Sequence, residues 1–91
     1  MKMKTIWLDE LIMPEAEKAA KSGKIVILPV GSVEEHGKHL PLCTDSLQPE
    51  NIAVKVAEKA GCLVAPPIRY GVCNVTRDFP GTISIGFGSL Y

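Results

Sequence analysis

The stretch Lys24–Val30, KIVILPV, together with the loop Gly31–Asp45, GSVEEHGKHLPLCTD, carries most of the information about the fold. The first segment is apolar after its lysine, rich in β-branched side chains and too short for a typical globular helix. A continuous apolar run of this kind is typical of a strand buried on both faces, as in a parallel sheet covered by helices. We therefore expect a buried strand that ends at Gly31 and Ser32.

Helical patterns flank this strand on both sides. Pro14–Ser22 is rich in Ala, Glu and Lys, opens with a proline that suits a first helical turn, and is followed by Gly23 as a left-handed stop. Ser46–Ala60 is the stronger pattern, with Ser46 as a candidate N-cap and Gly61 as its end. Its predicted apolar stripe consists of Ile52, Ala53, Val56, Ala57 and Ala60.

Two further strand candidates follow the second helix. Cys62–Ile68, CLVAPPI, is a short apolar run stopped by two prolines. Within residues 79–91, Ile83 and Ile85 alternate with Ser84 as in an edge strand. A strand, a helix and a second strand in succession predict a right-handed βαβ unit. We expect an α/β layered fold with a mainly parallel central sheet, in one domain over residues 1–91.

The loop after the first strand concentrates side chains that bind metals. In open α/β sheets, ligands bind beyond the carboxyl ends of the strands, where this loop lies. Glu34 and His36 share a face of an extended segment, and Asp45 lies at the foot of the next helix, where its two oxygens could bridge two ions. Carboxylates and imidazoles suit Zn²⁺ and Mn²⁺. The alternative is a solvated loop of charged residues, which is the commoner outcome for such a composition.

Composition argues against several classes of function. Ten Lys and Arg balance ten Asp and Glu, and the basic residues are scattered, so neither a nucleic acid nor an anionic membrane is expected as a partner. The three cysteines, Cys43, Cys62 and Cys73, are odd in number and widely spaced, which indicates reduced thiols. With no signal peptide or membrane-spanning run evident, we expect a soluble cytoplasmic protein.

The amino-acid sequence of the loop resembles that of the creatininase (creatinine amidohydrolase) family. LPVGSVEEHGKHLPLCTD, residues 28–45, is similar to the family hallmark, which reads roughly LPVGS-x-E-Q-HG-P-HLPL-x-TD. Tyr70 and Gly71, with FPGTIS at residues 79–84, resemble the family's YG…FPGTIS block, so the resemblance covers nearly all of the chain. It implies an α/β fold with a parallel central sheet and metal-dependent hydrolysis of a C–N amide bond in cyclic or linear amides.

The resemblance also implies a binuclear centre of Zn²⁺ or Mn²⁺, sometimes Fe, in a homohexamer. Carried over by position, Glu34 would ligate one metal, His36 would ligate the other, and Asp45 would bridge them. The implied reaction is attack of metal-activated water on an amide carbonyl of a small-molecule substrate. Beyond these ligands we assign no catalytic or cofactor-binding residue.

Several positions depart from the family pattern. Glu35 stands where Gln is usual and is expected to lie exposed or behind the ligands, and Lys38 stands where Pro is usual. Thr76 stands where many relatives have a histidine, which puts a substrate contact from that position in doubt. Structural rather than ligand roles are expected for His39, for Cys43, and for Arg77 and Asp78 as a surface pair.

Members of the resembled family are longer, and the match covers roughly their first third. The later part of the family contains an N-G-H-G-G-N-like segment and an acidic residue, which supply the remaining His and Glu ligands. We therefore expect an incomplete enzyme that is inactive by itself. Three readings stay open: the N-terminal portion of an amidohydrolase, a half-enzyme completed by another chain, and a non-catalytic oligomerising or binding module.

Overall fold

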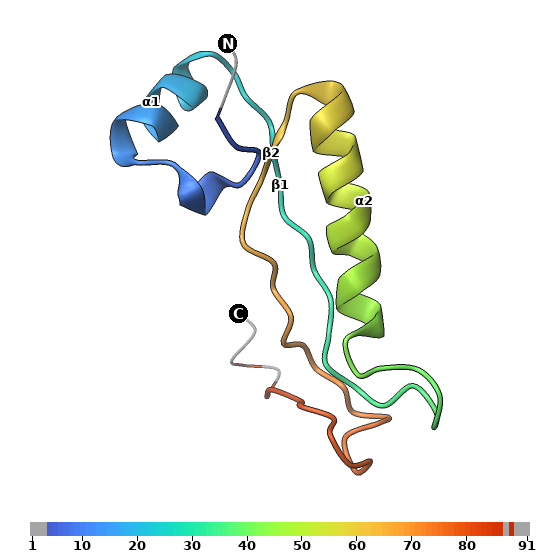
Figure 1. Cartoon of the computed structure of the whole chain (residues 1–91). Coiled ribbons are helices and arrows are strands. Elements are labelled where there is room, and N and C mark those ends of the chain that lie inside the picture. The colour runs from blue at the N-terminus through green and yellow to red at the C-terminus, as the bar shows by residue number, and fades with distance from the viewer. Residues whose placement is uncertain (1–3, 87, 89–91) are drawn as a thin grey trace.

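The computed structural model describes residues 4–86 and 88 and has an α/β architecture. Its elements are, in order, the 3-10 helix η1 (Leu8–Glu10), helix α1 (Met13–Lys21), strand β1 (Val26–Ile27), helix α2 (Thr44–Ala60) and strand β2 (Leu63–Val64). The two strands lie side by side in the middle of the molecule, with α2 along one side and α1 near one end (Figure 1). The predicted fold class is therefore confirmed.

The central sheet is parallel. Val26 of β1 lies opposite Leu63 of β2, and α2 is the crossover between the two strands, as the strand–helix–strand pattern predicted. An isolated parallel bridge joins Trp7 to Val64 on the other side of β2, and a second joins Val30 to Ile68 beyond the paired strands. β2 is thus the central segment and β1 an outer one.

The core lies between α2 and β2. Ala53 and Ala57 of the helix pack against Val64, and partly buried apolar side chains surround them, namely Ile6, Trp7, Ile27 and Cys62. Leu63 and Val64 are almost completely buried, which confirms the predicted buried strand within Cys62–Ile68. Because the helix side chains at the contact are alanines, the helix backbone lies close to the sheet.

The expectation that Lys24–Val30 is buried on both faces is wrong. Only Val26–Ile27 forms a regular strand, and Val26 and Leu28 are 45% and 50% exposed. The reason is that only one face is covered. Ile27 packs against Ala53 and Ala57 of α2, whereas Val26 and Leu28 alternate with it and point to the opposite face.

The predicted apolar stripe of α2 is correct only in part. Ala53 and Ala57 are buried, whereas Ile52 and Val56 are exposed to 63% and 44%. A sheet of two short strands covers only a narrow strip of the helix, so the neighbouring apolar positions of the stripe face outward.

Helix boundaries differ slightly from the predicted ones. α1 begins at Met13, one residue early, and α2 begins at Thr44, two residues before the predicted start. Ser46 is not the N-cap, because it lies inside the first turn of α2 and its hydroxyl donates to the carbonyl of Ser32 at 2.9 Å. Gly61 ends α2 in the left-handed conformation with φ 73°, as predicted. Among the described residues, no helix combines the length and apolarity needed to cross a membrane.

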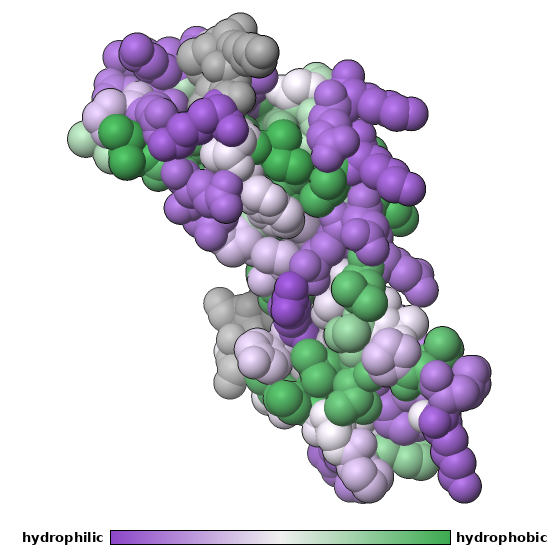
Figure 2. Space-filling view, viewed as in Figure 1, coloured by the Kyte–Doolittle hydropathy of each residue, from purple (hydrophilic) through white to green (hydrophobic). Residues whose placement is uncertain are grey.

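The segment after β2 returns to the loop that follows β1. In place of the predicted edge strand, Ile83 makes one antiparallel bridge with Val33 and Ser84 makes one parallel bridge with Gly71. The end of this predicted segment, at residues 87 and 89–91, lies outside the described residues. Apolar side chains gather on the surface over this end of the molecule (Figure 2), and those exposed in the two loops include Leu40, Leu42, Phe79 and Ile83.

Candidate metal centre

The loop after β1 is held against the first turn of α2 by close backbone contacts. Gly31 donates to the carbonyl of Ile68 at 2.7 Å, and a Cβ at Gly31 would lie only 2.6 Å from the carbonyl oxygen of Asp45 and from Cα of Ser46. The bond from the Ser46 hydroxyl to the Ser32 carbonyl closes the same contact. A glycine at position 31 therefore lets the loop approach α2 closely enough to bring Asp45 beside it.

The three predicted ligands come together at this junction. Nε2 of His36 lies 3.2 Å from Oδ1 of Asp45. The hydroxyl of Ser32 lies 3.2 Å from Oδ2 of Asp45 and 3.0 Å from Oε1 of Glu34. Because a hydroxyl has one proton, Ser32 can donate to only one of the two carboxylates at a time. Asp45 is the central member of the group, with one oxygen toward the histidine and the other toward Ser32 and Glu34.

Glu34 is held as a carboxylate by its neighbours. The hydroxyl of Thr76 donates to Oε2 of Glu34 at 2.6 Å, and this bond is the main cause that lowers the pKa of Glu34 below its usual value of 4.5. Partial burial opposes the shift, and further hydrogen bonds, including that from Ser32, reinforce it. Glu34 is therefore ionised, and acts only as an acceptor, over the whole neutral range.

Cys73 borders the same group from the segment after β2. Its thiol is buried, and burial is the main cause that raises its pKa above the usual 9.0. The negative charges of Glu34 and Asp45 raise the pKa of this thiol further. Cys73 is thus a neutral thiol beside two carboxylates.

Glu35 and His39 lie outside the group of ligands. The backbone N–H of Glu35 donates to the hydroxyl of Thr82 at 2.7 Å, and its carboxylate accepts from the N–H of Gly37 at 2.6 Å, so this side chain closes a turn of the loop. His39 is exposed and lies against Gly37. His39 was expected to serve the loop rather than bind metal, and Glu35 was expected to lie exposed or behind the ligands; in the structure Glu35 is half-buried and its carboxylate bonds within the loop.

The donor set fits a divalent cation in part. Two carboxylates and an imidazole are common ligands of Zn²⁺ and Mn²⁺. Nδ1 of His36 is buried without a hydrogen-bond partner in the described part of the chain, so one ring nitrogen is unsatisfied. Within residues 4–86 and 88, however, no three His, Cys, Asp or Glu side chains are grouped tightly enough to hold a metal ion. The side chains are of the types that bind metals, and in the described part of the chain they do not form a closed cage.

Three residues of this group were not recognised as part of a site from the sequence. The sequence indicates only that Ser32 ends a strand, that Cys73 is a reduced thiol, and that Thr76 departs from the family pattern. Cys73 and Thr76 are remote in sequence from Glu34, and no motif in one chain signals their approach. Ser32 is two residues from Glu34 on the same face of an extended segment, and that spacing could have identified it.

Comparison with known proteins decides the family. A family model described as creatinine amidohydrolase matches residues 9–91. The chain belongs to the creatininase family. The creatinine amidohydrolase of Pseudomonas putida is 36% identical over an alignment of 93 positions, which covers 96% of this chain. A mycofactocin precursor peptide peptidase of Mycolicibacterium smegmatis is 44% identical over 72 residues, which cover 72% of this chain.

Solved creatininase structures share the fold. A crystal structure of creatinine amidohydrolase superposes with a TM-score of 0.89 at 34% identity over 97% of this chain, and a manganese form of creatininase gives the same TM-score. A Zn–Zn type of a mutant creatininase gives 0.87. The chain spans about a third of the length of these relatives, between 29% and 36%.

Proposed function

We propose that the chain provides ligands for a divalent metal centre in an amidohydrolase of the creatininase type. The proposed ligands are Glu34, His36 and Asp45, and the proposed metals are Zn²⁺ or Mn²⁺, with Fe as a further option. The observation that carries the proposal is the convergence on Asp45, which lies 3.2 Å from His36 through one oxygen and 3.2 Å from Ser32 through the other.

The two-sided contacts of Asp45 favour a binuclear centre. Oδ1 faces the imidazole of His36, whereas Oδ2 faces the hydroxyl that also contacts Glu34. A carboxylate placed in this way can serve one ion on the side of His36 and another on the side of Glu34. When bound, such ions activate water and polarise the carbonyl of an amide.

The other residues of the group position these ligands. Thr76 keeps Glu34 ionised and fixes the direction of its carboxylate through the bond to Oε2. Ser32 sets the distance between the two carboxylates, because its hydroxyl lies within hydrogen-bonding distance of both. Residues behind metal ligands typically change metal affinity by about 10- to 100-fold when they are replaced.

The proposed reaction is hydrolysis of a C–N bond in a cyclic or linear amide. Creatinine and a precursor peptide appear in the names of relatives, which supports an amide substrate and leaves its identity open. Zinc usually takes about four ligands, so three ligands from this chain require further ones from elsewhere in the enzyme. We also propose a cytoplasmic location, because all three cysteines are free.

We propose that the active form is a homo-oligomer or a complex with a complementing chain. The supporting observation is one face of the first strand segment, where Val26, Leu28 and Val30 are exposed at alternate positions. Such a row of apolar side chains is typical of a surface that packs against other polypeptide. Light scattering coupled to size exclusion tests self-association. A purely monomeric chain that also gains no activity from any complementing chain would contradict this part of the proposal.

The metal proposal is tested by titrating Zn²⁺ and Mn²⁺ into the purified chain in a calorimeter. Asp45→Asn and His36→Gln should each weaken binding by at least about 100-fold, because each removes a proposed ligand. His39→Gln is the matched control, since it removes the other histidine of the same loop, and its affinity should equal that of the wild type. Affinities of Asp45→Asn and His36→Gln equal to that of the wild type, or equal losses in His39→Gln and His36→Gln, would overturn the proposal.

A further inference from the structure

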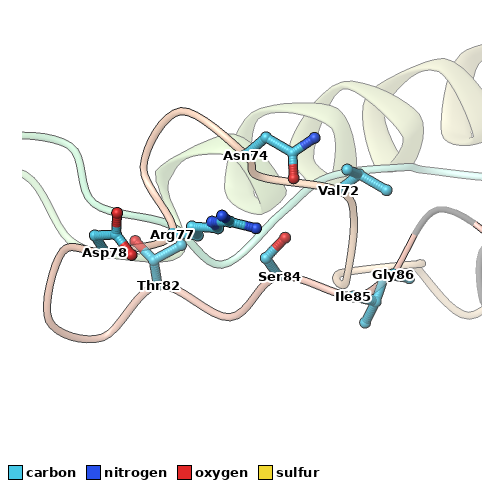
Figure 3. A pocket seen from close by; sticks show the side chains of 8 residues that line it. All are labelled: Val72, Asn74, Arg77, Asp78, Thr82, Ser84, Ile85 and Gly86. Atoms are coloured by element: carbon cyan, nitrogen blue, oxygen red, sulfur yellow. The ribbon is translucent and has the colours of Figure 1, made fainter.

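The segment that supplies Thr76 also forms a pocket. The pocket has a volume of about 530 Å³ and is lined by side chains of the range 72–86, among them Asn74, Arg77, Asp78 and Ser84 (Figure 3). Its volume is within the usual range for a small-molecule site. No role in metal binding has been given to any of these four residues.

The pocket adjoins the loop that carries the proposed metal ligands. Arg77 follows Thr76, whose hydroxyl contacts the carboxylate of Glu34. Thr82 lines the pocket and accepts the backbone N–H of Glu35, the residue between two proposed ligands. A molecule in the pocket would therefore lie next to the loop that carries Glu34 and His36.

Several groups of the polar lining can donate hydrogen bonds to a ligand. The hydroxyls of Thr82 and Ser84 accept hydrogen bonds from the backbone N–H groups of Glu35 and Cys73 at 2.7 Å and 2.9 Å. In the described part of the chain neither hydroxyl donates a hydrogen bond, so both protons are available to a ligand. Arg77 adds a guanidinium, which can only donate.

The guanidinium of Arg77 is available to a ligand. It points toward Ser84 and Asn74 and away from Asp78 (Figure 3). Among residues 4–86 and 88, it makes neither an ion pair nor a hydrogen bond, unlike Arg69, which pairs with Glu50 at 2.7 Å. The expected surface pair of Arg77 and Asp78 is therefore not formed.

Asp78 adds a negative charge to the lining. It lines the same pocket, so the lining carries one positive and one negative charge. Because the guanidinium of Arg77 points away from Asp78 (Figure 3), an anion bound by Arg77 lies on the side of the pocket away from the carboxylate of Asp78. The planar geometry of a carboxylate matches the fork of a guanidinium.

We infer that this pocket binds the carboxylate group of the amide substrate, with Arg77 as the residue that selects it. The inference rests on the proposed function, because it places a carboxylate-bearing amide beside the proposed metal ligands. Ser84 and Thr82 donate to the same carboxylate.

Titration of the ¹⁵N-labelled chain with N-acetylglycine, followed by NMR, tests the inference. Saturable shifts are expected for the amides of Asn74, Thr82 and Ser84. The neutral analogue N-acetylglycinamide should bind at least about tenfold more weakly, because it cannot form the charge-assisted pair.

Variants distinguish a specific contact of Arg77 with the carboxylate from a general effect of positive charge on binding. Arg77→Gln should weaken the binding of N-acetylglycine by about tenfold or more, and Arg77→Lys should lie between it and the wild type. Arg69→Gln is the matched control, since it removes the same charge outside the pocket, and should bind like the wild type. Asp78→Asn should bind phosphate more tightly than the wild type does.

Three results would overturn the inference: no saturable shift at concentrations on the order of tens of millimolar, equal binding of the neutral analogue, or no loss in Arg77→Gln. The titration needs no metal, so its outcome is independent of the calorimetric test above. A chain that binds Zn²⁺ through Asp45 and ignores N-acetylglycine would refute the pocket alone.

Discussion

Thr76→Val should destabilise the fold at neutral pH and do so progressively less as the pH is lowered. The hydroxyl that this substitution removes donates to Oε2 of Glu34 at 2.6 Å and is the main cause of the lowered pKa of that carboxyl group. A hydrogen bond to a charged group contributes about 1.5–3 kcal/mol. Because the pair is only partly buried and water can replace the hydroxyl, we expect a loss of about 1 kcal/mol at neutral pH.

The pH dependence follows from the direction of the shift. Since the pKa of Glu34 is lower in the folded state than in the unfolded chain, folding favours the ionised carboxylate. This stabilisation is present above the usual pKa of 4.5 and is lost as the pH falls through the lower folded-state value. Without the Thr76 hydroxyl, the pKa of Glu34 returns toward 4.5, so wild type and variant converge in acid.

Urea denaturation followed by circular dichroism between about pH 3 and pH 7 measures this difference. Thr76→Ser keeps the hydroxyl and serves as the control, with a stability expected to lie near that of the wild type at all pH values. A difference between Thr76→Val and the wild type that does not change with pH would show that valine acts by altered packing. A serine variant as unstable as the valine variant would refute the hydrogen-bond explanation as well.

Two further predictions concern the contacts around this group. Gly31→Ala should destabilise the fold by about 1–3 kcal/mol and weaken Zn²⁺ binding, because its Cβ would lie 2.6 Å from the Asp45 carbonyl. Gly23→Ala is the control, because a Cβ at that position meets nothing within 4 Å. It should lower stability through the left-handed backbone of residue 23 and leave Zn²⁺ affinity unchanged. Equal Zn²⁺ affinities in Gly31→Ala and Gly23→Ala would contradict the expected effect of Gly31→Ala on metal binding. Cys73 should react with iodoacetamide more slowly than Cys43 or Cys62 in native protein near pH 8, since it is buried and its pKa is raised. Mass spectrometry of the peptides measures the three rates, and equal rates in folded protein would show that the Cys73 thiol is accessible.

The elements of the fold were predictable because they depend on local pattern. Gly61 ended a helix, and the alternation of strand, helix and strand gave a parallel pair with a helical crossover. What failed was the degree of burial of Lys24–Val30, because an apolar run does not indicate whether both faces of a strand are covered. That property depends on which elements pack on the sheet, and in the described part of the chain Ile27 packs against α2 while Val26 and Leu28 on the opposite face stay exposed.

The candidate site was predictable only where it is contiguous in sequence. Glu34, His36 and Asp45 lie in one motif, and the structure brings them together. Thr76 and Cys73 reach the same place through the return of the segment after β2, and their approach depends on tertiary contacts such as the bond from Glu35 to Thr82. Hydrogen bonds of this kind leave no periodic signal in a single sequence.

Adjacent residues of the returning segment serve the two proposed sites. Thr76 contacts a proposed metal ligand through its hydroxyl, and Arg77 lines the pocket proposed for the carboxylate. A displacement of this segment would move both side chains, so orientation of Glu34 and placement of the substrate are coupled through one piece of backbone. Arg77→Gln should then leave Zn²⁺ affinity intact, because the backbone is unchanged. Gly81→Ala should shift the segment, because its Cβ would lie 2.6 Å from the side chain of Leu42, and should weaken the binding of both Zn²⁺ and N-acetylglycine. Loss of only one of the two in Gly81→Ala would show that the two sites are held independently.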